Sequence, residues 1–340
     1  MLKTLKILLL TLWLQVGVVW AGYVEEADAA MAKKDYATAL KKYRLAAAKK
    51  NAYAQYKIGN RYSVGLGVKK NLTEAARWYK LAATQGNADA QLNLATMYDS
   101  GQGVEKNPAE AVRWYKLAAA QGKIMAQLNL AISYHFGQGV GQDYTEAMRW
   151  YKLAATQENA AAQFNLGTMY SNGEGVEKDF AEALRWYKLA AQKGDVSAQL
   201  ILANSYAFGQ GVVQDYTEAV AWYKLAAAQK DATAQFNLAT MYDEGQGVAR
   251  DYTEAMRWYK LAAAQGKASA QSNLSLMYFN GQGVAQDYVR AHMWSNLSSI
   301  NSDAFKKKRD AIAEKMTAQQ IAEAQKLARE CQLRNLKNCD

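Results

Sequence analysis

Residues 143–178 read DYTEAMRWYKLAATQENAAAQFNLGTMYSNGEGVEK, and close copies of this stretch fill most of the 340-residue chain. Three residues mark the copies, each recurring at a step of 36: a tryptophan (Trp78, Trp114, Trp150, Trp186, Trp222, Trp258, Trp294), a tyrosine (Tyr62, Tyr98, Tyr134, Tyr170, Tyr206, Tyr242, Tyr278) and a glycine (Gly65, Gly101, Gly137, Gly173, Gly209, Gly245, Gly281). Self-similarity at one fixed period predicts a tandem array of a single structural unit.

Each unit is expected to contain two antiparallel helices. Asp143-Tyr-Thr-Glu146 resembles a capping box, in which the aspartate accepts from free amides and the glutamate reaches back. An apolar face at helical spacing follows it: Ala147, Trp150, Tyr151 and Ala154. A second helix is predicted from about residue 160 to 171, with inward residues Ala162, Leu166 and Tyr170. One such pair leaves a face that only a neighbouring unit covers.

Glycines separate the two helices in most units. Gly86, Gly122, Gly194 and Gly266 follow the first helix, where a left-handed residue is required. Glu158 and Lys230 replace that glycine in two units. The second helix runs into a GxG turn, as in FGQGVGQDY at 136–144. A dinucleotide loop needs a preceding strand, but here a helix precedes, so we interpret this motif as a turn.

The pattern WYKLAAxQGxAxAQxNLAxMYxxGxGVxxDYxEAxR resembles the Sel-one-like repeat (SLR) family, which is related to the tetratricopeptide repeat. The resemblance covers residues 36–300 and implies an all-α fold, a right-handed superhelical solenoid of antiparallel helix pairs in 36-residue repeats. Residues 22–35 then form an N-terminal capping helix, and residues 301–340 form C-terminal capping helices. Thr317-Ala-Gln-Gln320 is predicted to be a capping box.

The resemblance also carries an expected function. Its members typically serve as adaptors, which implies a non-enzymatic scaffold for protein–protein interactions in the cell envelope or with a host partner. Cysteine-rich relatives suggest the alternative of a cell-wall-related hydrolase with β-lactamase-like activity. Those relatives carry cysteine pairs inside each unit, whereas this chain has cysteine only at 331 and 339. We therefore favour a scaffold, monomeric or weakly associating, that binds a protein or peptide.

The first 21 residues have the pattern of a secretory signal peptide. Lys3 and Lys6 precede an apolar run, and Val19 and Ala21 place small residues before the expected cleavage site. An uncleaved membrane anchor is the alternative, although the run is short for a span of ~20 residues. Cleavage predicts a periplasmic or secreted protein without an integral membrane segment.

Cys331 and Cys339 are expected to pair in an oxidising compartment. The chain-entropy treatment of so short a loop gives a stabilisation of roughly 2.5 kcal/mol. The disulfide would fasten the C-terminal tail.

The chain is basic, with a formal net charge of +10 that falls to +8 when Lys3 and Lys6 leave with the signal peptide. Basic charge is often a sign of nucleic-acid binding, but an exported protein rarely meets nucleic acid. Anionic envelope polymers, lipid headgroups and acidic protein surfaces are the partners that this charge favours. Simple solubility is the other explanation.

No catalytic, cofactor-binding or metal-binding arrangement is apparent. The motifs HExxH and GxSxG are absent from the sequence. His135 and His292 occupy different positions in the repeat, and we expect each to be an exposed residue without a chemical role. The tryptophans lie among alanines and are expected to form the core.

A basic ladder is the first candidate surface for partner binding. Its members lie three residues apart on the first helix of successive units: Arg77 and Lys80, Arg113 and Lys116, Arg149 and Lys152, Arg185 and Lys188, Arg257 and Lys260, with Lys224 alone. Stacked units would align them into a stripe. The structural alternative is pairing with the glutamate three residues before each arginine, which is worth a few tenths of a kcal/mol, roughly.

An asparagine ladder on the second helix is the other candidate: Asn93, Asn129, Asn165, Asn237 and Asn273, each two residues after a glutamine. Asparagine is a poor helix residue, so its recurrence needs a cause. Its amide can hold the backbone of an extended peptide, because it both donates and accepts. The alternative is a structural hydrogen bond to the backbone or loop of the neighbouring unit.

Overall fold

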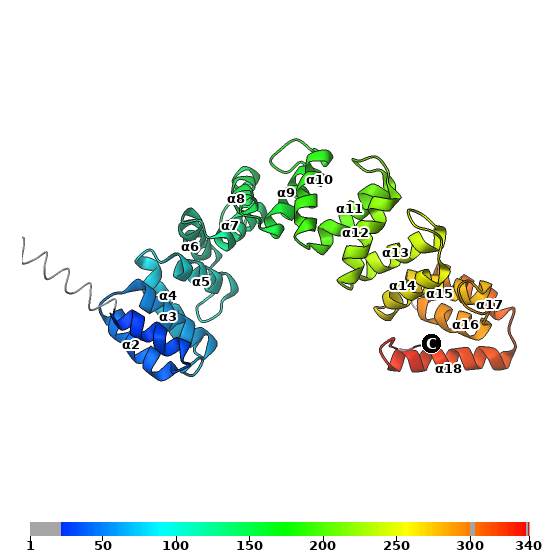
Figure 1. Ribbon diagram of the computed structural model, residues 1–340, viewed down its shortest axis with the longest axis horizontal. Coiled ribbons are helices and arrows are strands. Elements are labelled where there is room, and N and C mark those ends of the chain that lie inside the picture. The colour runs from blue at the N-terminus through cyan, green and yellow to red at the C-terminus, as the bar shows by residue number, and fades with distance from the viewer. Residues whose placement is uncertain (1–21, 300–302, 338, 340) are drawn as a thin grey trace, which may run out of the picture. The chain divides into compact units, whose positions relative to one another are not determined.

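The computed structural model describes residues 22–299, 303–337 and 339, and within them the regular structure is entirely helical (Figure 1). The helices form two compact units. The first comprises the chain up to Met169 together with Gly173–Glu177, and the second comprises Tyr170–Asn172 and Lys178–Asp340. The predicted signal peptide lies outside the described residues. No helix within them is long and apolar enough to cross a membrane.

The first unit begins with a helical segment over residues 22–32. Its helices are then α2 (Tyr36–Ala48), α3 (Ala52–Val64), α4 (Leu72–Thr84), α5 (Ala88–Ser100), α6 (Pro108–Ala120), α7 (Ile124–Phe136), α8 (Tyr144–Thr156) and the larger part of α9 (Ala160–Asn172). The even-numbered helices are the first helices of the repeats, and the odd-numbered helices are the second helices.

The second unit continues the same alternation. Its helices are α10 (Phe180–Gln192), α11 (Val196–Phe208), α12 (Tyr216–Ala228), α13 (Ala232–Glu244), α14 (Tyr252–Ala264), α15 (Ala268–Asn280), α16 (Tyr288–Ser298), α17 (Asp303–Ala313) and α18 (Ala318–Leu333). In both units a second helix packs most extensively on the first helix of the following repeat, as α3 does on α4 and α13 on α14. This stacking makes the fold a solenoid, as the repeat pattern predicts.

The helix starts follow the expected capping chemistry only in part. Asp143 accepts from the backbone amides of Thr145 and Glu146, which satisfies free donors at the start of α8. Glu146 was expected to reach back to the cap, but its carboxylate instead binds Arg149 and the indole of Trp150. The full reciprocal capping box is present at Thr317 and Gln320, where α18 begins.

The GxG motif is a turn, as predicted. Gly137 ends α7 with φ +68°, and Gly139 has φ +72°. A Cβ on Gly139 would lie 2.2 Å from the carbonyl oxygen of Pro108, so only glycine lets the turn approach the start of α6 so closely. The turn after α7 therefore packs against the start of α6, and this contact occupies the backbone of the motif.

A left-handed residue also follows the first helix of the pairs from α2 to α14, and at Lys50, Glu158 and Lys230 it is not glycine. Glu158 and Lys230 have φ of 61° and 67°, where an L-residue is disfavoured.

We expect Glu158→Gly and Lys230→Gly each to raise the free energy of unfolding by about 0.5–1 kcal/mol, measured by urea unfolding. Gly86→Ala should lower it, since φ there is +88° and a Cβ would meet no atom within 4 Å. Equal stability of all three variants would contradict the backbone explanation.

The core consists mainly of alanine, tyrosine, leucine and methionine, and most tryptophans of the repeats are not part of it. Tyr43, Tyr115, Tyr151, Tyr223 and Tyr259 are among the largest fully buried side chains. Trp114 and Trp294 are buried, but Trp78, Trp150, Trp186, Trp222 and Trp258 are only half-buried. The prediction of a tryptophan core is therefore wrong for most copies. The tyrosine that follows each of these half-buried tryptophans lies between the helices. The wider indole lies at the edge of the same helix face.

Both ends of the described chain are covered by helical segments. Ala27 and Ala30 of the leading segment pack against α2, which covers the first repeat. At the other end α18 packs on α16 (Figure 1). The Cα atoms of Cys331 and Cys339 lie 5.0 Å apart, with the sulfurs placed as a disulfide pair, which suits such a bond.

Candidate functional site

The exposed side of the first helices carries three columns of residues, which we call the Arg–Leu–Lys surface. In the first unit it comprises Lys41, Arg44 and Leu45 on α2, Arg77, Lys80 and Leu81 on α4, Arg113, Lys116 and Leu117 on α6, and Arg149, Lys152 and Leu153 on α8. In the second unit it comprises Arg185, Lys188 and Leu189 on α10, Lys224 and Leu225 on α12, and Arg257, Lys260 and Leu261 on α14. Each helix presents these residues on one side because the second and third follow the first position by three and four residues.

From α4 to α14, the arginines of this surface are paired within their own helices. Arg77, Arg149 and Arg257 lie 2.6, 3.1 and 2.9 Å from the glutamates three residues earlier. Arg113, Arg149 and Arg257 also lie over the neighbouring tryptophan rings. The structural alternative for the basic ladder is thus present. The guanidinium groups nevertheless stay open to solvent, since the Arg185 side chain is 81% exposed beside its glutamate.

Three lysines of the ladder, on α6, α12 and α14, lie over tyrosine rings on the second helix of the same repeat. The Lys116 ammonium lies 5.3 Å from the Tyr134 ring centroid, and Lys224 lies 5.6 Å from that of Tyr242. Arg44 takes the same position in the first repeat and donates to the Tyr62 hydroxyl at 3.0 Å. The surface therefore combines cationic groups with half-buried aromatic rings.

A column of exposed leucines is the part of this surface that sequence reasoning missed. Leu45, Leu81, Leu117, Leu153, Leu189, Leu225 and Leu261 are each between 40% and 50% exposed. One exposed leucine needs no explanation, but the same exposure in seven successive copies is unusual. A shallow depression runs along α8 beside one of them, lined by Thr145, Met148, Arg149, Lys152, Leu153 and Thr156. The recurring WYKL could have indicated the column.

The last repeat shows what happens when this face is covered. Met293 stands at the position of Arg257 and is 1% exposed, and Leu297 stands at the position of Leu261 and is 4% exposed. Helix α17 follows α16 as a second helix does in every repeat, so it does not account for the difference. The additional helix is α18, which packs on α16 through Ala324, Ala328 and Cys331.

The asparagine ladder is structural where its contacts are described. Asn273 donates to the Tyr259 hydroxyl at 2.8 Å. Asn93 donates to Asn60 at 3.4 Å, and Asn237 donates to Asn204 at the same distance in the second unit. Asn60 and Asn204 also accept from Tyr79 and Tyr223 at 2.6 Å. Asn129 lies near Tyr115, and Asn165 is half-buried. Asn93 and Asn237 therefore bond to an asparagine side chain of the preceding repeat and Asn273 to a tyrosine of its own repeat, rather than to a neighbouring backbone or loop.

Burial gives these tyrosines a fixed protonation state. It raises the pKa of Tyr223 and of Tyr259 to about 12, and it raises the pKa of Tyr151 further. A tyrosine hydroxyl is already protonated at physiological pH, and the raised pKa keeps these hydroxyls protonated at higher pH as well. They act as hydrogen-bonding links between repeats.

A second amide network, which sequence reasoning did not assign, joins the repeats at the other end of the helices. A buried glutamine of each second helix donates to the end of its own first helix, as Gln91 does to the Ala83 carbonyl at 3.1 Å. Its side-chain oxygen accepts from the following repeat, in this case from Gln121 at 2.7 Å. The same link recurs for Gln55, Gln127, Gln199 and Gln235. The spacing of 30 residues between these glutamines was the available signal.

The two histidines are buried, so the prediction that they are exposed is wrong. His135 is 7% exposed and His292 is 2% exposed. Burial lowers the pKa of His292, and its Nδ1 lies 3.0 Å from the amide of Asn296. His135 lies against Tyr144 and Tyr151 in the first unit. Each fills a gap between helices. Within the described residues no three His, Cys, Asp or Glu side chains are placed to hold a metal ion.

Stacked helix pairs with one repeated exposed face define an α-helical repeat protein. The chain belongs to the Sel1 repeat family: the family model matches residues 52–87, 88–123, 124–159, 160–195, 196–231, 232–267 and 268–301. Each match starts at a second helix and ends after the following first helix, and within each unit these two helices form the pair that packs most extensively. Proteins of this family are generally scaffolds for protein–protein interaction and are typically non-enzymatic.

Two solved structures support the assignment. The c5321 protein, described as a protective antigen present in uropathogenic Escherichia coli strains and displaying an SLR fold, is 33% identical; the match covers 89% of this chain and 73% of that chain, with a TM-score of 0.57. A Sel1 repeat protein from Oxalobacter formigenes is 37% identical; the match covers 71% of this chain and 99% of that chain, with a TM-score of 0.61. A search of curated proteins gave no match.

Proposed function

We propose that the protein is an exported, non-enzymatic scaffold that binds an amphipathic helix of a partner protein on its Arg–Leu–Lys surface. The observation that carries this proposal is α18, which covers the equivalent face of the last repeat. The chain thus already pairs this kind of face with a helix in its own fold.

The residues of the open repeats indicate how the partner helix differs from α18. At the position of Arg257 the covered repeat has Met293, so covering that repeat buries no guanidinium group. In the open repeats each leucine is flanked by an arginine and a lysine, apart from α12, which has lysine only. A partner helix with an apolar stripe for the leucines and acidic residues at its margins complements this arrangement.

The location of the protein is part of the same proposal. The signal-peptide pattern of residues 1–21 supports export to the periplasm or the cell exterior. The similar c5321 protein is described as a protective antigen. A disulfide between Cys331 and Cys339 fits such a compartment. A host protein or an envelope protein is the corresponding partner.

Substitutions on one unit test the surface. We expect Leu117→Ser with Leu153→Ser to weaken capture of the partner from the envelope fraction at least about tenfold, because each leucine loses its apolar contact. Quantitative mass spectrometry of the captured proteins, with wild type alongside, gives the measurement. Circular dichroism checks that the helices remain.

Two charge variants separate a helix partner from an anionic polymer. Arg113, Lys116, Arg149 and Lys152 are changed to alanine in one; the control changes four exposed turn lysines, Lys69, Lys70, Lys106 and Lys178, and so removes the same charge. A helix partner requires both the leucines and the ladder and is retained by the control variant. An anionic polymer would give a different result. Its binding would disappear with salt, would be insensitive to the leucine changes and would be weakened equally in both charge variants.

A further inference from the structure

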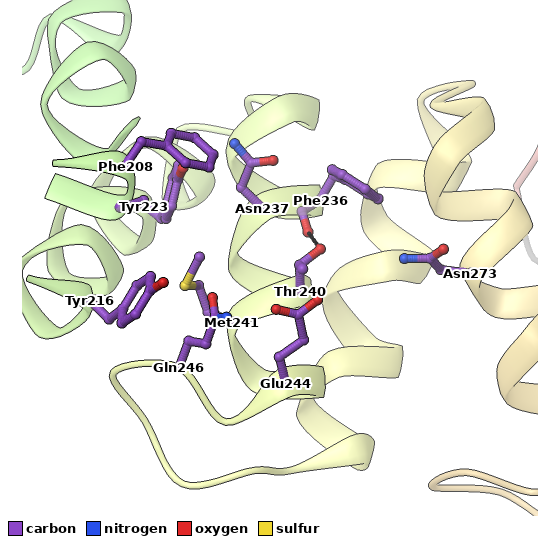
Figure 2. A pocket seen from close by; sticks show the side chains of 11 residues that line it. Phe208, Tyr216, Tyr223, Phe236, Asn237, Thr240, Met241, Glu244, Gln246 and Asn273 are labelled. Atoms are coloured by element: carbon purple, nitrogen blue, oxygen red, sulfur yellow. Dashed lines mark hydrogen bonds between the residues drawn. The ribbon is translucent and has the colours of Figure 1, made fainter. Parts of the chain in front are cut away.

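A separate pocket lies in the second unit, away from the Arg–Leu–Lys surface. It has a volume of about 400 Å³ and is lined by side chains of α11, α12, α13 and α15. Figure 2 shows Phe208, Tyr216 and Tyr223 facing α13, which carries Phe236, Met241 and Glu244. The amides of Asn237 and Asn273 also line it. Its wall thus combines four aromatic rings with amide side chains and one carboxylate.

The same position in the first unit is filled by a side chain of the protein itself. Two repeats before Ala207 stands His135, whose ring is buried. The imidazole stacks on Phe136 with ring centroids 4.5 Å apart and planes at 4°. It meets Tyr144 and Tyr151 edge-on, at 5.5 and 6.0 Å.

A carboxylate completes the surroundings of that imidazole. His135 Nε2 lies 2.9 Å from the Glu174 carboxylate, and its Nδ1 lies 3.4 Å from the Tyr151 hydroxyl. The filled site therefore shows which group these walls fit. It is a planar nitrogen base, stacked on one ring, bordered by two others and placed beside an acid.

The open pocket keeps these walls but lacks the central group. Phe208, Tyr216 and Tyr223 occupy the positions of Phe136, Tyr144 and Tyr151, whereas alanine at 207 removes the imidazole. Gln246 replaces Glu174, and an acid appears instead two residues earlier, at Glu244. Phe208 is 68% exposed, so its ring is accessible from outside.

We propose that this pocket binds the side chain of an arginine from a partner peptide. A guanidinium group is planar, remains charged at physiological pH and stacks on aromatic faces. Phe208 offers the stacking surface, Glu244 the anionic acceptor, and Asn237 and Asn273 the further acceptors. Arginine suits the pocket better than histidine because a partner residue must reach in from solvent, which a long side chain allows. In the first unit no such reach is needed, because α7 itself carries the imidazole. The pocket shares no residue with the Arg–Leu–Lys surface, so it can be tested whether or not that surface binds a helix.

Small probes measure this binding on the full-length protein. Saturation-transfer NMR titrations would compare N-acetyl-L-argininamide with the amides of citrulline and lysine. Citrulline has nearly the same shape without the charge. We expect the arginine probe to bind at least about tenfold more tightly than the citrulline probe, since charge-assisted hydrogen bonds are lost in the latter. Equal binding of the three probes would overturn the proposal.

Two substitutions locate the binding in this pocket. Ala207→His places in the pocket the residue that fills the first unit, so it should abolish binding of the arginine probe while the helices remain. Glu244→Gln should weaken that binding about tenfold, and the control Glu105→Gln, at an exposed turn of the first unit, should leave it unchanged. Unchanged binding in Glu244→Gln would refute the proposal even if Ala207→His failed to fold.

Discussion

Replacement of Tyr259 by alanine is expected to lower the free energy of unfolding by about 3–5 kcal/mol. The side chain is fully buried between α13, α14 and α15. Its hydroxyl lies 3.2 Å from Thr240 and accepts from Asn273 at 2.8 Å. The substitution would leave both a cavity and polar groups without their partner. Urea unfolding followed by circular dichroism measures the effect.

The adjacent tryptophan provides the matched control. Trp258 is larger than Tyr259 but only half-buried, and its ring lies beneath the solvent-exposed Arg257. We expect Trp258→Ala to have a smaller effect than Tyr259→Ala, since part of the indole already contacts water. A larger loss for Trp258→Ala would show that tryptophan, as the sequence pattern indicated, is the principal core residue.

A second large effect is expected for Ala324→Glu on α18. Ala324 is 0% exposed against α16, and a carboxylate placed there is buried without a partner. Such a charge costs roughly 3–5 kcal/mol. Helix α18 should therefore detach and uncover Met293 and Leu297. Hydrogen exchange of the α16 amides should accelerate, and trypsin should cleave at exposed basic residues of α18.

Ala322→Glu is the control for this experiment. It adds the same charge to the same helix, but Ala322 is exposed. The variant should keep the wild-type exchange and cleavage pattern. Equal cleavage of both variants would mean that helix stability, rather than contact with α16, is being measured. The interpretation of α18 as a covering helix would then fail, and the proposed helix-binding surface would lose its main support.

The architecture could be predicted from the sequence because its determinants are local and repeated. Asp143 precedes α8 because its carboxylate accepts from a free backbone amide of the first turn. Gly137 ends α7 because glycine readily adopts the left-handed conformation. Repetition of both at a constant step makes each helix pair stack on the next. The wrong predictions concern side-chain contacts and burial. Glu146 follows the cap at capping-box spacing, yet its carboxylate binds Arg149, which lies one helical turn further on.

The candidate sites were only partly predictable, for a related reason. The arginines and lysines of the ladder were identifiable by charge and spacing. The leucines were not, because leucine beside WYK fits a buried face as well as an exposed one, and only packing shows which. The asparagines were visible as an anomaly, but their role depends on tyrosines such as Tyr223 and on Asn204 in a neighbouring repeat.

The sequence by itself determined the helix pairs, their period, the turns between them and membership of a solenoid class, because these follow from backbone conformation and hydrogen bonds within a few residues. Tertiary structure decided which face of each first helix stays open, since burial depends on what packs from elsewhere. It covered Leu297 with α18 and left Leu261 exposed, although the two occupy the same position in the repeat. It also made Ala207 part of a pocket and His135 part of a filled core, a difference that arises only where tyrosines from another helix surround them.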